Sequence, residues 1–126
     1  MEPWEKLLQK ADASLKAAEL LLQHEMLAFA VSRAYYAMFY ATKALLLRRG
    51  IQPRTHRGVI TAFGQHFVKT GIFAPHYHRW LLNALDQRLI SDYELEVTLT
   101  IEEVETLLEQ ARTFLTSIKA YLESET

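Results

Sequence analysis

Apolar residues recur at steps of three and four along most of the chain, which is the spacing of one helix face. The first such row predicts a helix over residues 3–23, and Pro3 suits its first position. A second predicted helix covers residues 27–49 and ends at Gly50, which can adopt a left-handed C-terminal cap. Residues 51–54 are predicted to form a loop.

The same spacing predicts three more helices. Thr55 can cap a third helix that continues through Val68. A fourth covers residues 75–93. Thr100 and Glu103 fit a capping box that starts a fifth, with its apolar row ending at Leu122.

Little in the pattern favours any strand. A weak alternation over residues 95–99 is too short, so we interpret it as a loop. Connections between the predicted helices are short, which makes consecutive helices antiparallel neighbours. The sequence therefore predicts an all-α fold, an antiparallel up-and-down bundle of four to five helices in a single domain over residues 1–126.

Composition narrows the class of protein. Half of the 126 residues are apolar, enough for one core, and there is no cysteine. A disulfide framework, a thiolate metal site and a cysteine nucleophile are therefore excluded. The first residues lack the pattern of a signal peptide, and no apolar run approaches the roughly 20 residues that span a membrane. We expect a cytoplasmic protein that does not interact with a membrane.

The net charge of −1 conceals a basic middle. Residues 33–93 hold nine Lys or Arg against two Asp, whereas both flanking segments are acidic. A segregated positive region is typical of a site for an anionic ligand. Alternatively, the acidic last helix packs against this region and neutralises it.

The second predicted helix carries two notable rows. One is a stripe of small side chains that would let the first or last helix approach closely: Ala30, Ala34, Ala37, Ala41 and Ala44. The other, which we call the basic-aromatic row, consists of Phe29, Arg33, Tyr36, Tyr40, Lys43 and Leu47. In one interpretation, Arg33 pairs with an acid and Lys43 extends its ammonium group to water. In the other, Arg33, Tyr36, Tyr40 and Lys43 line a cleft for a phosphate-bearing ligand.

The fourth predicted helix places Arg88 and Asp92 one turn apart, on a row that begins with core positions. Such a pair can be structural, or it can belong to a catalytic or binding site. We expect Arg88 and Asp92 to lie in one cleft with Arg33, Tyr36 and Tyr40, because an unpaired charge in a crowded core is costly.

Histidines add one candidate. His56 lies at the expected start of the third helix, where backbone N–H groups favour anions, although it can equally pack locally. His76 and His78 are two residues apart and point in different directions on a helix, so we expect no metal site. There is no glycine-rich phosphate loop or nucleophile elbow, and we expect no cofactor.

Three segments resemble the HEPN family (higher eukaryotes and prokaryotes nucleotide-binding). The longest is SRAYYAMFYATKALL at residues 32–46. THRG at 55–58 with FGQHF at 63–67, and RLISDY at 88–93, resemble later blocks of one HEPN branch. The similarity extends over essentially the whole chain and occurs in the family's order.

The resemblance implies a helical bundle that dimerises and that is encoded beside a minimal nucleotidyltransferase in a toxin–antitoxin-like pair. Active members are metal-independent ribonucleases with an Arg followed, four to six positions later, by a His, and two copies meet across a dimer cleft. Arg88 matches the Arg, but Asp92, Tyr93 and Glu94 occupy the His positions. Tyr93 in this block is a further candidate contact to a ligand.

Three functions remain open. In the first, the chain is the HEPN partner of a nucleotidyltransferase and binds RNA or a nucleotide in a homodimer cleft without cleaving it. In the second it is an active ribonuclease toxin, with Arg88 and Asp92 as catalytic residues or with His56 supplying the proton. In the third it is a structural dimerisation module whose basic residues are consumed by internal salt bridges.

Overall fold

The computed structural model describes residues 1–96 and 98–125 of the chain. These residues form five α-helices and a π-helical turn: α1 Pro3–Gln23, α2 Leu27–Arg48, α3 His56–Phe63, η1 Gly64–Val68, α4 Pro75–Tyr93 and α5 Ile101–Ser124. No strand occurs in this part of the chain, and the all-α bundle is confirmed. Of the expected loop at 95–99, residue 97 lies outside the described residues.

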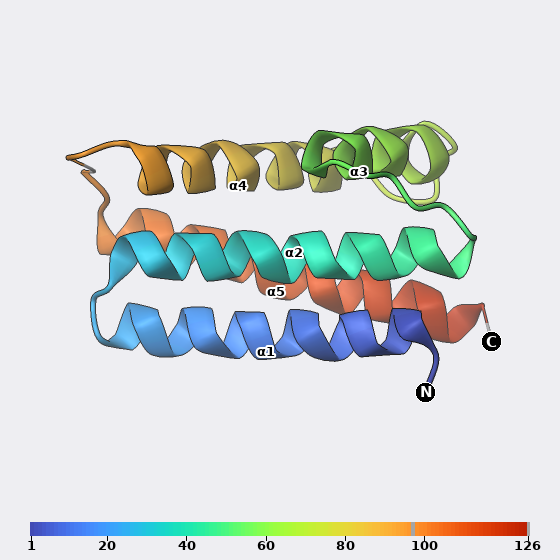
Figure 1. Cartoon of the computed structure of the whole chain (residues 1–126), viewed down its shortest axis with the longest axis horizontal. Coiled ribbons are helices and arrows are strands. Elements are labelled where there is room, and N and C mark those ends of the chain that lie inside the picture. Colours follow the sequence, from blue (N-terminus) through green and yellow to red (C-terminus); the bar gives the residue numbers. More distant parts are fainter. Residues whose placement is uncertain (97, 126) are drawn as a thin grey trace.

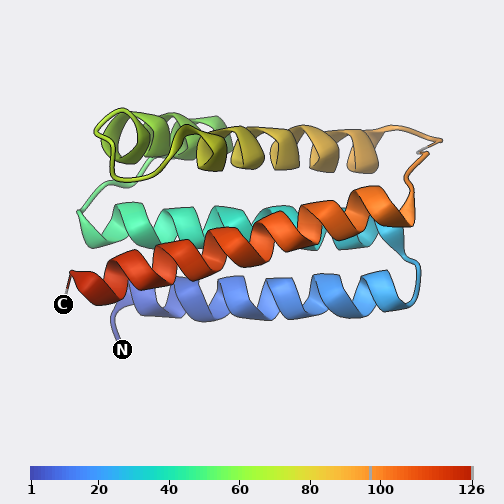
Figure 2. The same cartoon turned by 180° about the vertical axis from the view of Figure 1, so that it is seen from behind.

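The long helices run alternately in opposite directions (Figure 1). α1 lies on one side of α2, whereas α3 and α4 form a layer on the other side, and α5 crosses behind α2 (Figures 1 and 2). Both termini lie at the same end of the bundle, at the opposite end from the connection between α4 and α5. α2 is therefore central, and its remaining face is not covered by another helix in Figure 1.

The small-residue stripe of α2 is buried in the core. Ala30, Ala34, Ala37, Ala41 and Ala44 have no exposed surface. α1 presents small buried side chains of its own, Ala11, Ser14 and Ala18. Ser14 Oγ donates a hydrogen bond of 2.7 Å to the backbone oxygen of Arg33, which requires the two helices to lie close together.

Side-chain caps explain where several helices begin. Thr55 accepts a hydrogen bond of 2.9 Å from the Gly58 N–H, as predicted. Thr100 accepts one of 3.1 Å from the Glu103 N–H. At α1, Glu2 and Glu5 form a reciprocal capping box that was not predicted.

The third predicted helix is not a continuous α-helix. Its α-helical hydrogen bonding ends at Phe63, and residues 64–68 form a π-helical turn closed by Lys69 N–H donating to Gly64 O at 2.8 Å. A Cβ atom at Gly64 would lie 3.2 Å from the His78 ring. The absence of a side chain at Gly64 therefore allows the start of α4 to pack closely against the π-helical turn. The spacing of apolar residues does not reveal this turn.

The acidic last helix packs against both α1 and α2, and its two basic residues pair with acids of α1. Arg112 of α5 lies 2.9 Å from Glu19 of α1, and Lys119 contacts Asp12. Two residues of the basic middle do contact α5, since Arg48 donates to the backbone oxygen of Leu122 and Arg49 to the Tyr121 hydroxyl. None of the helices in the described residues has the length and apolar character needed to cross a membrane.

Candidate ligand-binding site on α2 and α4

Tyr36 of α2 contacts two arginines. The guanidinium carbon of Arg33 is 4.8 Å from the centre of the Tyr36 ring, and that of Arg88 is 5.2 Å from it. Arg88 extends from α4 and also lies 5.9 Å from the centre of the Tyr35 ring. Arg33, Tyr36 and Arg88 therefore lie near one another on a partly exposed surface of α2 and α4. That they line one cleft with Tyr40 and Asp92 remains a prediction.

Asp92 completes this cluster through its pair with Arg88. Arg88 Nε lies 2.9 Å from Asp92 Oδ2, with the two side chains 20% and 32% exposed. The Nε atom is buried and still lacks a partner of hydrogen-bond geometry in the described residues. We therefore regard the contact as an ion pair with a poorly aligned N–H, which limits its contribution to stability.

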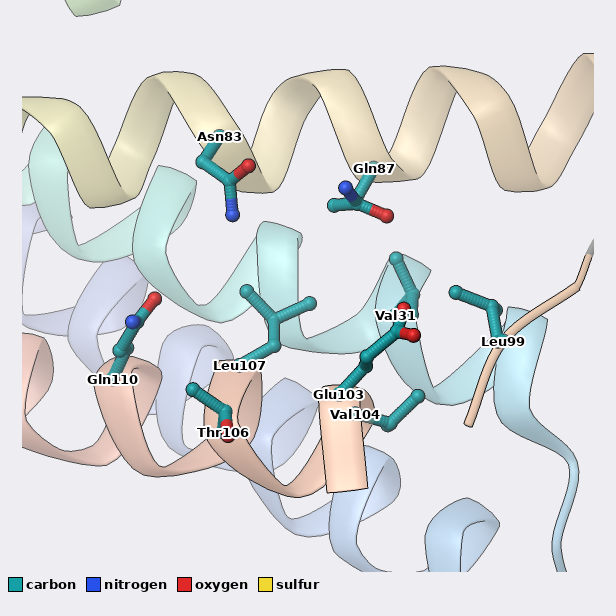
Figure 3. Close-up of a pocket in the computed structure, with 9 residues that line it drawn as sticks. All are labelled: Val31, Asn83, Gln87, Leu99, Glu103, Val104, Thr106, Leu107 and Gln110. Atoms are coloured by element: carbon teal, nitrogen blue, oxygen red, sulfur yellow. The ribbon is translucent and has the colours of Figure 1, made fainter. Parts of the chain in front are cut away.

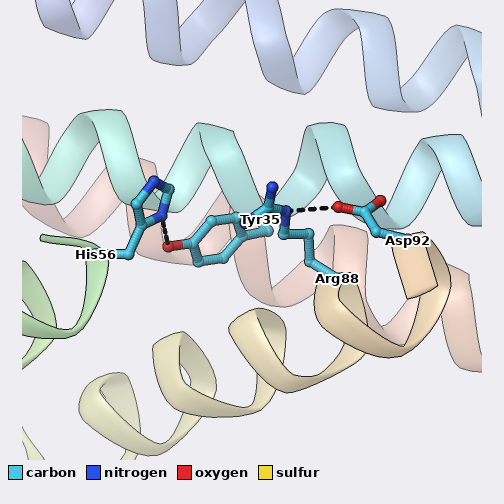
Figure 4. Close-up of polar contacts among 4 residues, drawn as sticks. All are labelled: Tyr35, His56, Arg88 and Asp92. Atoms are coloured by element: carbon cyan, nitrogen blue, oxygen red, sulfur yellow. Dashed lines mark hydrogen bonds and ion pairs between the residues drawn. The ribbon is translucent and has the colours of Figure 1, made fainter.

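His56 joins the cluster from the first position of α3. Its Nδ1 atom lies 2.7 Å from the hydroxyl of Tyr35, and its ring stacks on Phe39 at 4.2 Å between centres. Figure 4 shows His56, Tyr35, Arg88 and Asp92 arranged in sequence along α2. His56 therefore packs locally, which was one of its two interpretations. Its role in binding an anion remains a prediction.

The hydrogen-bond network sets the tautomer of His56. Tyr35 is 0% exposed, and in the described part of the chain its hydroxyl has only His56 as a hydrogen-bond partner. Burial raises the pKa of Tyr35 above its ordinary value, so the phenol keeps its proton. Because Nδ1 is the one acceptor within reach of this buried O–H in the described residues, we assign Tyr35 as the donor and Nδ1 as the acceptor. Neutral His56 therefore carries its own proton on Nε2, which is a donor.

Burial and charge both keep His56 neutral. Burial lowers its pKa below the ordinary value of 6.5, and the positive charges of Arg88 and Lys43 lower it further. At neutral pH this side chain is a fixed hydrogen-bond donor next to Arg88. It is neither an imidazolium nor a base at its Nε2 atom.

The rest of the basic-aromatic row extends along α2 from this cluster. Tyr40 packs on Tyr36 at 5.5 Å between ring centres and lies below Lys10 of α1, whose Nζ atom is 4.7 Å from the Tyr40 centre. Lys43 Nζ lies 5.8 Å from the centre of Phe39. Lys10 was not among the predicted residues, since its position depends on how α1 packs.

Tyr93 is not brought into the cluster. It is the last residue of α4 and is 75% exposed, and the described residues include no ring contact to it. Its role as a ligand contact remains a prediction.

Positive charge exceeds negative charge on this surface. Arg33 and Lys43 have no acidic partner among the described residues, and Asp92 is committed to Arg88. One interpretation of the sequence paired Arg33 with an acid on a neighbouring helix. The described residues show no such pair. Cationic groups that share an aromatic surface without counter-ions are suited to bind phosphate.

A different hollow lies between α4 and α5 (Figure 3). It has a volume of about 250 Å³, and the polar side chains that line it include three amides and the carboxylate Glu103. The amides are Asn83, Gln87 and Gln110. No lysine or arginine lines this hollow in the described residues, so it lacks the positive charge of the surface around Arg33 and Arg88. Nowhere in the described residues do three or more histidine or carboxylate side chains group as a metal site.

The proximity of Arg88 to His56 predicts a measurable change in pKa. Replacing Arg88 by alanine removes a positive charge that opposes imidazole protonation, so the pKa of His56 should rise. It should stay below 6.5, because burial is the larger cause of the shift. An NMR pH titration of the His56 ring protons measures this, with Arg79→Ala as a control on the same helix. An unchanged His56 pKa in Arg88→Ala would contradict the arrangement.

Comparison with known proteins agrees with the fold and the motifs. The chain matches the family model described as HEPN domain over residues 4–121. A protein of Methanocaldococcus jannaschii named "Putative toxin" is 41% identical over 121 residues, covering 96% of this chain and 82% of the relative. A UPF0332 protein of Thermotoga maritima is 36% identical, covering 98% and 91%.

A solved structure shows the same fold. A crystal structure of a protein from Thermus thermophilus superposes with a TM-score of 0.80 at 19% identity, covering 95% of this chain and 98% of the other. This likeness concerns the helical architecture, whereas the family model and the relatives concern the sequence itself. From the extent of these matches, the chain belongs to the HEPN domain family.

Proposed function

We propose that this protein is the RNA-binding HEPN component of a toxin–antitoxin-like pair and acts together with a minimal nucleotidyltransferase. The observation that supports binding most strongly is the position of Arg33 and Arg88 on one tyrosine ring, where Asp92 is the acid that pairs with Arg88 in the described residues. A phosphate group bound beside this ring would accept hydrogen bonds from guanidinium donors and offset their positive charge. The toxin name of two relatives supports the toxin–antitoxin context.

RNA suits the surface better than a small anion does. Tyr36 and Tyr40 offer aromatic faces on which bases can stack, next to cations for the phosphates. A purely structural dimerisation module would need these cations to be consumed internally. Among the described residues, Arg33, Lys43, Arg54 and Arg57 have no ion pair with an acid.

The same geometry favours binding without cleavage. Cleavage at a ribose 2′-OH needs one group to accept a proton and another to donate one. His56 has its Nδ1 occupied by Tyr35 and is held neutral, so it serves poorly in either role. Asp92, the other proposed catalytic residue, is paired with Arg88. The alternative, a metal-independent ribonuclease that uses Arg88 and Asp92, would have to supply a second proton-transfer group.

We further propose that the protein forms a homodimer through the end of the bundle next to this cluster. Phe29 of α2 is 63% exposed, and Ile90 and Tyr93 of α4 are 45% and 75% exposed. The start of α2 and the end of α4 lie at the same end of the molecule (Figure 1). Light scattering at micromolar concentration should give twice the mass of one chain, and a clean monomer would contradict the dimer.

Binding and cleavage can be tested on the same sample. The fluorescence anisotropy of a labelled single-stranded RNA should increase when the protein is added. The affinity of the protein for the RNA should fall as the salt concentration rises. A denaturing gel of that RNA, incubated with the protein in a chelator, should show no shortening. Absence of binding at low salt would refute the proposal. Shortened RNA would replace it by the ribonuclease alternative.

A further inference from the structure

A second hollow lies at the C-terminal end of the basic-aromatic row, away from Arg88. It has a volume of about 490 Å³, within the range of about 300–1,000 Å³ that is usual for ligand pockets. Leu47, Ile51 and Pro53 are among its apolar lining residues, and Lys43 and Arg54 contribute the positive charges. No acid lines it.

The loop that forms one wall of this hollow is held in place. Gly50 has a φ of 74° and donates its N–H to Leu47 O at 2.8 Å, and the Ile51 N–H donates to Leu46 O at 3.0 Å. Past the turn, a Cβ atom at Gly58 would meet Pro53 Cβ at 3.2 Å, so the loop also packs against the start of α3. The hollow is therefore a preformed feature of the fold.

Arg54 in this loop has no structural role that the described residues reveal. It is exposed, and it makes neither an ion pair nor a hydrogen bond within them. Lys43, by contrast, belongs both to the hollow and to the basic-aromatic row, with its ammonium group over Phe39. Lys43 thus connects the hollow to the surface that carries Tyr36 and Arg88.

The spacing along α2 fits a strand of several nucleotides. Leu47 follows Tyr36 by eleven residues, which at a rise of about 1.5 Å per residue is about 16 Å. A stacked nucleotide advances by only about 3.4 Å, so several stacked nucleotides are needed to cover this distance, and a mononucleotide at Arg88 does not reach the hollow. Tyr40 lies between the two positions and offers a ring for an intervening base.

We propose that this hollow is a second nucleotide subsite, which receives a base of a single-stranded RNA against Leu47 and Pro53 while Arg54 and Lys43 hold the adjoining phosphate. The proposal rests on the proposed function, since the first part of the strand occupies the Arg88 cluster. It deepens that function by making the ligand an oligonucleotide that follows α2. A free nucleotide would fill only one of the two positions.

The test compares a hexanucleotide with a dinucleotide. Labelled oligouridylates of both lengths are titrated with the wild-type protein, with Arg54→Gln and with Arg79→Gln. Arg79 is an exposed arginine of α4 that lies outside the hollow, so this control matches the change in charge. Arg54→Gln should weaken hexanucleotide binding about tenfold, the value of one good charged contact, and should leave dinucleotide binding within about twofold.

A second reading is the salt dependence. For the hexanucleotide, the logarithm of the binding constant falls linearly with the logarithm of the salt concentration. Arg54→Gln loses one phosphate contact, so the magnitude of this slope should decrease by about 0.7, whereas Arg79→Gln should leave the slope unchanged. If Arg54→Gln and Arg79→Gln behave alike, or both lengths bind wild type equally, the subsite is overturned while the proposed function stands. If neither oligonucleotide binds the wild-type protein, the proposed function itself fails, and the subsite fails with it.

Discussion

Arg88→Ala is expected to bind single-stranded RNA at least tenfold more weakly than the wild-type protein and to melt within a few degrees of it. Arg88 lies on Tyr36 beside Arg33, where its guanidinium group can donate to a phosphate. A hydrogen bond to a charged group contributes about 1.5–3 kcal/mol, which corresponds to roughly 10- to 100-fold in affinity. Binding is measured by anisotropy at several salt concentrations, and melting by circular dichroism.

The small effect on stability follows from the environment of Arg88. Removing one partner of a fully buried ion pair typically costs about 3–5 kcal/mol, but the Arg88 and Asp92 side chains are 20% and 32% exposed. Arg88→Ala instead removes a poorly aligned ion pair and a cation–π contact. Together these contribute about 1 kcal/mol to the free energy of unfolding.

The matched control for this variant is Arg79→Ala on the same helix. Arg79 is exposed and lies outside the cluster, so this change should leave both affinity and melting temperature close to those of the wild type. If Arg88→Ala unfolds, or if it binds RNA as tightly as the wild type, then Arg88 is part of the scaffold and the binding interpretation is wrong.

Ala37→Leu is expected to give the largest loss of stability. Ala37 is in the middle of the small-residue stripe of α2 and has no exposed surface. The hydrogen bond from Ser14 of α1 to the backbone oxygen of Arg33 shows how closely the neighbouring helix approaches. Added methyl groups must push helices apart, at a cost of about 1–3 kcal/mol or somewhat more.

Urea unfolding measures this loss against a control with the same change at an exposed site. Ala13 is on the exposed face of α1, so Ala13→Leu should alter the free energy of unfolding by less than about 0.5 kcal/mol. An Ala37→Leu protein as stable as the wild type would mean that the helices are less tightly packed than described. Because Ala37 faces the core, RNA binding by the folded fraction should persist.

The helices were predictable because their signals are local. Apolar spacing, Pro3, Gly50 and the capping threonines mark helix limits, and the structure confirms them to within about two residues, apart from the π-helical turn. The Arg88–Asp92 pair and the contact between Arg33 and Tyr36 could also be anticipated. Residues three or four apart on one helix are neighbours wherever that helix lies.

Other parts of the site depend on tertiary packing. The bond between Tyr35 and His56 joins residues 21 positions apart, and it requires the loop after α2 to bring the start of α3 back over Phe39. The position of Lys10 over Tyr40 likewise requires the pairing of α1 with α2. The sequence identified His56 as a candidate ligand-binding residue. It could not show that the Nδ1 atom of His56 is hydrogen-bonded to Tyr35.

The location of the RNA on the protein tests the account most directly. Chemical-shift mapping with a single-stranded oligonucleotide should perturb Tyr36, His56 and Arg88 most strongly, with the His56 Nε2–H among the affected signals. We expect little change at Ala13 and Arg112, which lie on exposed positions of α1 and α5. Perturbations centred on the face formed by α1 and α5, or none at saturating RNA, would contradict the assignment of the binding site to α2 and α4.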